Sequence, residues 1–106
     1  MRRLLFILLP FSLAGHANAD YYDGAELHKM LSASDRVGPL FGRAYIAGVQ
    51  DLANGSYVCI PENVTLVQAT AIVKKYLGEN PEKWHQAAKQ IVIDALRVPF
   101  PCPQKK

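Results

Sequence analysis

Cys59 and Cys102 are the only cysteines in the 106-residue chain, and they bracket most of its C-terminal half. If the chain is exported to an oxidising compartment, each has only the other as a partner within one chain. Closing a loop of about 44 residues would contribute roughly 4 kcal/mol to stability in the chain-entropy model. Small domains bury little apolar surface and often need such a restraint. We therefore expect a Cys59–Cys102 disulfide; the alternatives are a free reactive thiol or a bridge between chains.

The N-terminus predicts export. A basic head with Arg2 and Arg3 precedes an apolar stretch, and residues 17–19 read Ala-Asn-Ala, so residues 1–19 have the pattern of a cleavable signal peptide. The apolar stretch is too short to span a bilayer, and the alternative is a buried N-terminal helix. We expect residues 20–106 to form a single mature domain outside the membrane. The formal net charge of +3 falls when the two arginines leave, which gives no sign of nucleic-acid binding.

The first part of the mature sequence predicts two helices. Asp23 would cap a helix that ends near residues 32–35, with an apolar face of Leu27, Met30 and Leu31. Residues 36–39 predict a turn. A second helix would follow over residues 40–52, with a core face of Phe41, Ala44, Tyr45, Gly48, Val49 and Leu52. Because Ala44 and Gly48 are small and one turn apart, we expect a neighbouring backbone to approach them closely.

The second half predicts a loop and a helical hairpin. Residues 55–63 lack a helical period and predict an extended loop, pinned in its middle by a cysteine. Thr65-x-x-Gln68 has the form of a capping box and would begin a third helix that ends at Gly78. Pro81 would open a fourth helix after a tight turn, so the last two helices should lie antiparallel. The predicted fold class is all-α, a small four-helix bundle stapled by one disulfide.

Residues with catalytic or metal-binding chemistry are sparse. The sequence after the leader has two histidines and neither a His-Glu-x-x-His nor a Cys-x-x-Cys pattern, so we expect no metal, no cofactor and no enzyme. Cys59, His85 and Asp94 could form a thiol triad only if the thiol stayed reduced. A disulfide is the simpler use of that cysteine, and the protein is better interpreted as a binding protein.

The loop at residues 55–63 is the best candidate for partner contact. Tyr57 and Val58 have no helical stripe to join, and interfaces favour tyrosine. We therefore predict a partner-binding surface on this loop, made of Ser56, Tyr57, Val58, Glu62 and Asn63.

Several short motifs, in their order and spacing, resemble a known family. They are Gly42-x-x-Tyr45-Ile46-Ala47-Gly48-Val49-x-Asp51, Cys59-Ile60-Pro61-x-x-Val64-Thr65-x-x-Gln68, Val73-x-x-Tyr76-Leu77, Pro81, Ala95-Leu96 and Phe100-Pro101-Cys102. This arrangement, over residues 42–102, resembles the Rap/Tai immunity proteins, which protect bacteria against peptidoglycan amidases delivered by type VI secretion.

The resemblance implies an all-helical periplasmic protein, often a homodimer, that binds the amidase and blocks its substrate groove. It implies structural roles for Cys59, Cys102, Thr65, Gly48 and Pro61, whereas toxin-contacting residues vary between members of the family. The alternative from another functional class is a small periplasmic stress chaperone of HdeA-like architecture, compared by size and helical content. A third possibility is a purely structural envelope protein.

Overall fold

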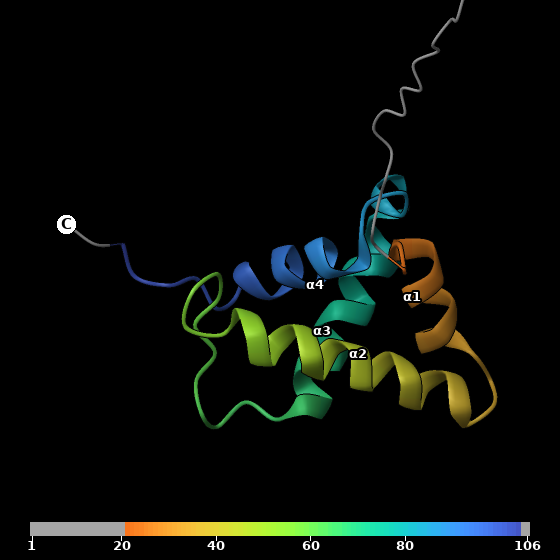
Figure 1. Cartoon of the computed structure of the whole chain (residues 1–106), viewed down its shortest axis with the longest axis horizontal. Helices are drawn as coiled ribbons and strands as arrows, with labels where there is room; N and C mark the ends of the chain where they lie inside the picture. Colours follow the sequence, from red (N-terminus) through yellow and green to blue (C-terminus); the bar gives the residue numbers. More distant parts are fainter. Residues whose placement is uncertain (1–20, 105–106) are drawn as a thin grey trace, which may run out of the picture.

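The computed structural model describes residues 21–104, which form four α-helices and one short 3-10 helix. The elements, in chain order, are α1 Gly24–Ser32, α2 Val37–Ala53, α3 Leu66–Glu79, η1 Pro81–Lys83 and α4 Ala88–Arg97 (Figure 1). The described residues contain isolated β-bridges and no strand. The predicted all-α class is therefore confirmed. The predicted signal peptide lies outside the described residues, and no helix in residues 21–104 is both long and apolar enough to cross a membrane.

The relative positions of α2 and α4 explain why the segments that follow these two helices come close together. Figure 1 shows α2 and α4 side by side and running in the same direction, while α3 crosses both. Their C-terminal ends therefore meet at one end of the molecule, and α1 lies at the other end. The predicted antiparallel pairing of the last two helices is wrong, because α4 runs across α3.

All four helices contribute to one core, whose largest fully buried side chains are Leu27, Ile46, Leu77, Ile91, Leu96, Val58, Val73 and Val92.

The fourth helix begins later than the sequence predicts. Pro81 does open a helical turn, but that turn is the short η1, and Ala87 is extended with φ −59° and ψ 137° before α4 starts. The break has a physical cause in the first turn of α1, whose backbone N–H groups have no partner within their own helix. The carbonyl of Trp84 accepts from the Ala25 amide at 3.1 Å, and the carbonyl of Gln86 accepts from the Gly24 amide at 2.9 Å. These long-range bonds fix residues 84–87 in a non-helical path.

The start of α2 also differs from the prediction. Residues 36–39 were expected to form a turn, but α2 begins at Val37 and includes Pro39 in its first turn. Proline is tolerated there because the first amides of a helix have no intrahelical acceptor. The Asp35 carboxylate accepts from the Gly38 amide at 2.9 Å and so satisfies one of those amides.

The capping residues of α1 and α3 agree with the sequence. The Asp23 carboxylate accepts from the Glu26 amide at 2.9 Å. Thr65 and Gln68 form both bonds of the capping box, at 3.1 Å and 2.8 Å. α3 continues one residue beyond the predicted end at Gly78.

The buried face of α2 agrees only in part with the predicted one, since Tyr45 and Val49 are partly buried against the core as expected. Gly42, Ile46 and Ala53 are buried, whereas Phe41 is 63% exposed and Leu52 is 84% exposed. Apolar residues cover more than half of the circumference of α2, so periodicity alone could not select the face that packs on the core. The outward-facing residues remain exposed.

The close backbone approach expected at Gly48 is not seen among residues 21–104, where a Cβ added at Gly48 would meet nothing within 4 Å. The glycines of α2 that permit close packing are Gly38 and Gly42. An added Cβ would lie 2.9 Å from the Met30 carbonyl oxygen at Gly38 and 2.6 Å from Cδ2 of Leu31 at Gly42.

Candidate functional site

The disulfide between Cys59 and Cys102 fixes the loop that follows α2. The bond lies within one chain, with an S–S distance of 1.99 Å and Cα atoms 4.8 Å apart, which confirms the predicted pairing. The Cys59 amide also donates to the Phe100 carbonyl at 2.9 Å. One covalent bond and one hydrogen bond therefore join the loop to the segment after α4.

The first half of the loop folds tightly around the end of α2. The Ala53 carbonyl accepts from the amides of Ser56, Tyr57 and Val58 at 2.9–3.3 Å. Gly55 has φ +93°, a left-handed conformation that glycine adopts without steric cost, and its amide donates to the Val58 carbonyl at 2.7 Å. The turn is therefore closed by its own backbone.

Val58 is the one predicted contact residue whose expected exposure the structure contradicts. Its side chain is 0% exposed and belongs to the hydrophobic core. The tight turn after Ala53 directs Val58 inward while Tyr57, its neighbour, is 60% exposed. Val58 therefore anchors the loop to the core and does not reach a partner.

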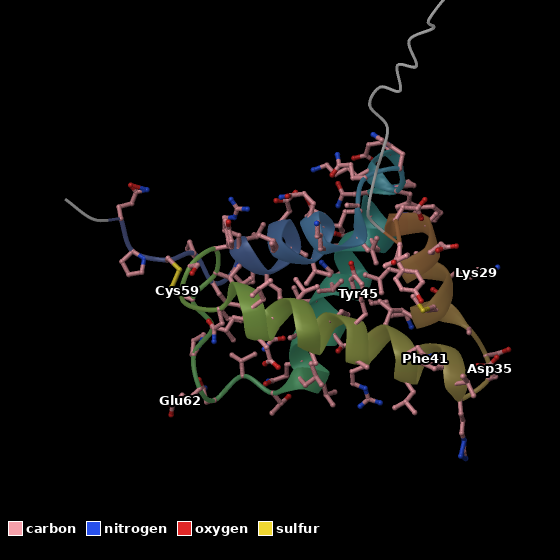
Figure 2. The ribbon with its side chains drawn as sticks, viewed as in Figure 1. Lys29, Asp35, Phe41, Tyr45, Cys59 and Glu62 are labelled. Atoms are coloured by element: carbon pink, nitrogen blue, oxygen red, sulfur yellow. A yellow bond between two sulfur atoms is a disulfide. The ribbon has the colours of Figure 1, made fainter. Side chains whose placement is uncertain are left out.

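The second half of the loop bulges away from the body of the protein. The Asn54 side chain accepts from the Ile60 amide at 2.9 Å, and the Val64 amide donates to the Pro61 carbonyl at 3.1 Å. Between these restraints, Glu62 lies at the outer bend of the loop (Figure 2), and both Glu62 and Asn63 are exposed. The loop thus presents Ser56, Tyr57, Glu62 and Asn63 on a backbone that is held at both ends.

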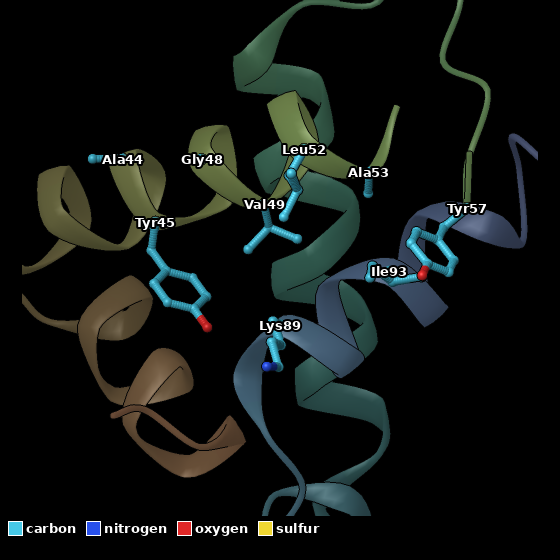
Figure 3. A pocket seen from close by; sticks show the side chains of 9 residues that line it. All are labelled: Ala44, Tyr45, Gly48, Val49, Leu52, Ala53, Tyr57, Lys89 and Ile93. Atoms are coloured by element: carbon cyan, nitrogen blue, oxygen red, sulfur yellow. The ribbon is translucent and has the colours of Figure 1, made fainter. Parts of the chain in front are cut away.

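An apolar groove of about 360 Å³ begins beside Tyr57 and runs between α2 and α4. Figure 3 shows the Tyr57 ring lying over Ile93 at one end of the groove and Tyr45 at the other end. Tyr22 packs edge-on against Tyr45, with ring centroids 5.6 Å apart. The wall from α2 contains mostly small and aliphatic residues, which suits an apolar partner surface rather than a charged ligand.

The apolar surface of the groove continues through Ala44, Gly48 and Leu52 onto the outer side of α2, and we call this exposed face the α2 stripe. Its residues follow helical spacing and are all exposed: Val37, Leu40, Phe41, Ala44, Gly48 and Leu52. The sequence analysis found four of these residues but assigned them to the core. The signal that could have corrected this assignment is the second apolar face formed by Gly42, Ile46 and Ala53.

The thiol triad considered in the sequence does not form among the described residues. Cys59 is in a disulfide, so the thiol triad considered with His85 and Asp94 has no thiolate. Asp94 instead accepts from Gln90 at 2.9 Å and from Arg97 at 3.3 Å. Within residues 21–104, no group of three His, Cys, Asp or Glu side chains could hold a metal ion.

Side chains around η1 make contacts that hold neighbouring helices together. The Lys83 amine donates to the Tyr76 hydroxyl at 3.0 Å, and this hydrogen bond, followed by the charge interaction with Tyr76, raises the pKa of Lys83. His28 stacks on Trp84 with ring centroids 4.4 Å apart. The Trp84 indole N–H donates to the Leu77 carbonyl at 2.8 Å. These side chains connect α1, α3 and η1.

Comparison with protein families gives a match that spans nearly all of the described residues. The model of Rap1a immunity proteins matches residues 23–102, from the cap of α1 to the second cysteine. The chain belongs to the Rap1a immunity protein family. The match includes α1, which the sequence resemblance over residues 42–102 had left out. No curated protein matches the chain.

Membership of the Rap1a family indicates the general function of this chain. It supports an immunity role in type VI secretion, with an effector protein as the partner, and suggests inhibition without catalysis.

Proposed function

We propose that this Rap1a family member is a periplasmic immunity protein that binds a type VI peptidoglycan amidase effector and occludes its substrate groove. The observation that carries the proposal is the loop at residues 55–63, which has an exposed tyrosine on a backbone fixed by the Cys59–Cys102 disulfide. The proposed contact residues are Ser56, Tyr57, Glu62 and Asn63, with Val58 as their buried support.

A fixed loop is suited to inhibition by occlusion. Binding costs entropy when a loop must be ordered, and this loop is already held by the disulfide, the Val58 anchor and the Asn54 side chain. Tyr57 offers a large, rigid surface with few rotatable bonds, and such residues dominate the binding energy of interfaces. Tyr57 is therefore the expected centre of the contact.

The proposed location follows from the disulfide and the leader pattern together. Disulfides persist in oxidising compartments such as the bacterial periplasm, and residues 1–19 have the pattern of a signal peptide. An amidase that cleaves peptidoglycan would act in the same compartment. We also propose that the protein works there as a homodimer.

The HdeA-like chaperone remains the rival function, and the exposed α2 stripe is the feature that favours it. A chaperone would suppress aggregation of unrelated proteins at low pH without a specific partner. The family match favours immunity, because it covers residues 23–102 with a model built on immunity proteins. Light scattering of an acid-denatured test protein separates the two functions: suppression supports the chaperone and no suppression supports immunity.

The test of the contact loop is a binding titration with the proposed amidase effector. Tyr57→Ala is expected to weaken binding about 30-fold or more, the effect of removing an interface hot spot. Tyr21→Ala is a matched control, because Tyr21 is 90% exposed and precedes α1, at the end of the molecule away from the loop. Equal affinity of wild type and Tyr57→Ala, with sedimentation showing the same oligomer for both, would remove the loop from the account.

A further inference from the structure

A small cleft of about 240 Å³ lies between α2 and α3 and shares no residue with the groove beside Tyr57. Three helices form its walls, and the lining residues are Leu31 of α1, Pro39 and Arg43 of α2, and Val67, Thr70 and Lys74 of α3. Sites for drug-sized ligands usually have volumes of about 300–1,000 Å³. This cleft therefore suits a smaller molecule or a single chemical group.

Two positive side chains from different helices line the cleft without a negative partner. Arg43 is only partly exposed, whereas Lys74 is exposed. Neither forms an ion pair or a side-chain hydrogen bond within residues 21–104, and no carboxylate lines the cleft. Partial burial of an unpaired guanidinium costs free energy, and a second positive charge nearby adds repulsion. An anion in the cleft would relieve both costs.

A hydroxyl group at the same place also has no partner. Thr70 lies one helical turn before Lys74, and its Oγ1 atom is buried without a hydrogen bond among the described residues. Threonine in a helix adopts two χ1 rotamers, so one rotation exchanges its methyl and hydroxyl groups. Such a rotation would turn the hydroxyl from the interior toward the cleft, where it could donate to an anion.

The rest of the lining is apolar and sets the kind of anion that fits. Leu31, Pro39 and Val67 offer no side-chain donor, and proline also lacks an amide hydrogen. A bare inorganic anion would lose hydration against these residues and gain no contact. An anion with a short hydrocarbon chain would instead bury apolar surface there. The lining therefore favours an aliphatic carboxylate over phosphate.

We propose that the cleft between α2 and α3 binds a small aliphatic carboxylate. The guanidinium of Arg43 donates two parallel hydrogen bonds to the carboxylate, a geometry that arginine matches better than lysine. Lys74 adds positive charge at the entrance, the Thr70 hydroxyl donates a further bond, and the hydrocarbon part packs on Leu31 and Val67. A free short-chain acid and the small C-terminal residue of a peptide share this chemistry.

The test is a titration of the purified, isotope-labelled protein at constant ionic strength, followed by the NMR shifts of the Arg43 and Thr70 amides. Butyrate represents the free acid and N-acetylalanine the peptide terminus, and the tighter of the two identifies the source. Both are expected to give saturable shifts. Inorganic phosphate should bind about tenfold more weakly than butyrate, because it buries no hydrocarbon. Sodium chloride keeps the ionic strength fixed and is the reference anion.

Charge-removing variants show whether the cleft itself binds the carboxylate. Arg43→Gln should raise the dissociation constant of butyrate about tenfold, because it removes the charged pair of donors. Arg36→Gln and Lys75→Gln are the matched controls: each removes one positive charge from an exposed residue outside the cleft, and each should change the constant by less than about twofold. Circular dichroism checks that all three variants fold.

Thr70→Val tests the hydroxyl separately. It should weaken butyrate binding about threefold without lowering stability in urea, because it removes an unpartnered hydroxyl and keeps the shape of the side chain. An unchanged dissociation constant would contradict the proposed rotation of Thr70. Absence of saturable shifts, phosphate binding as tight as butyrate, or equal losses in Arg43→Gln and the controls would overturn the site. None of these results bears on amidase binding, which the titration of Tyr57→Ala tests.

Discussion

The loop at residues 55–63 and the α2 stripe are adjacent in sequence, but they obtain their shapes in different ways. The loop has few apolar side chains on its outer side, and it is held by the disulfide, the Asn54 side chain and the buried Val58. The stripe needs no restraint beyond its own helix and presents apolar side chains with no partner in the described chain. The comparison shows that the shape of the loop depends on contacts outside any helix, whereas the stripe is shaped by one helix alone.

The largest expected effect comes from removing the restraint on the loop. Replacing both cysteines with serine should lower the free energy of unfolding by about 3–4 kcal/mol, because the unfolded chain regains the entropy of an open loop. Urea denaturation of the double variant against wild type measures this loss. A loss below about 1 kcal/mol would mean that the hydrogen bonds of the loop suffice without the disulfide.

A smaller loss of stability is expected at the buried side of the loop, and almost none at its exposed side. Val58→Ala should cost about 2 kcal/mol, since it removes two buried methyl groups from a fully enclosed site. Tyr57→Ala, at the adjacent exposed position, should change stability by less than about 0.5 kcal/mol. Thermal and urea unfolding of the two variants test the contrast, and similar losses for both would show that Tyr57 packs in solution.

The smallest changes in the free energy of unfolding are expected from glycine substitutions on the two faces of α2. Gly42→Ala should cost about 1–2 kcal/mol, because the added methyl group would lie too close to the buried Leu31 side chain. Gly48→Ala should instead raise the free energy of unfolding by up to about 1 kcal/mol, since it meets open space and alanine favours the helix. Opposite signs in urea denaturation would confirm which face of α2 is buried.

The sequence predicted those features that depend on local chemistry. The caps at Asp23 and Thr65 follow from side chains at the start of each helix. The disulfide followed from cysteine count and the export pattern together.

The features that the sequence did not predict depend on contacts between distant segments. Residues 84–87 leave the helix because the amides of Gly24 and Ala25, about 60 positions earlier, bond to their carbonyls. The buried face of α2 depends on which side α1 and α4 occupy, and apolar residues on both sides made either choice consistent with the pattern. Val58 was misassigned because a loop has no period from which burial can be inferred.

The most direct test of the central claim is hydrogen exchange of the loop amides with and without the amidase. The amides of Glu62 and Asn63 form no hydrogen bond within the described residues, so they should exchange rapidly in the free protein. If the loop enters the substrate groove of the amidase, exchange at these two positions should slow strongly in the complex. Unchanged exchange at Glu62 and Asn63 in a saturated complex would contradict the account.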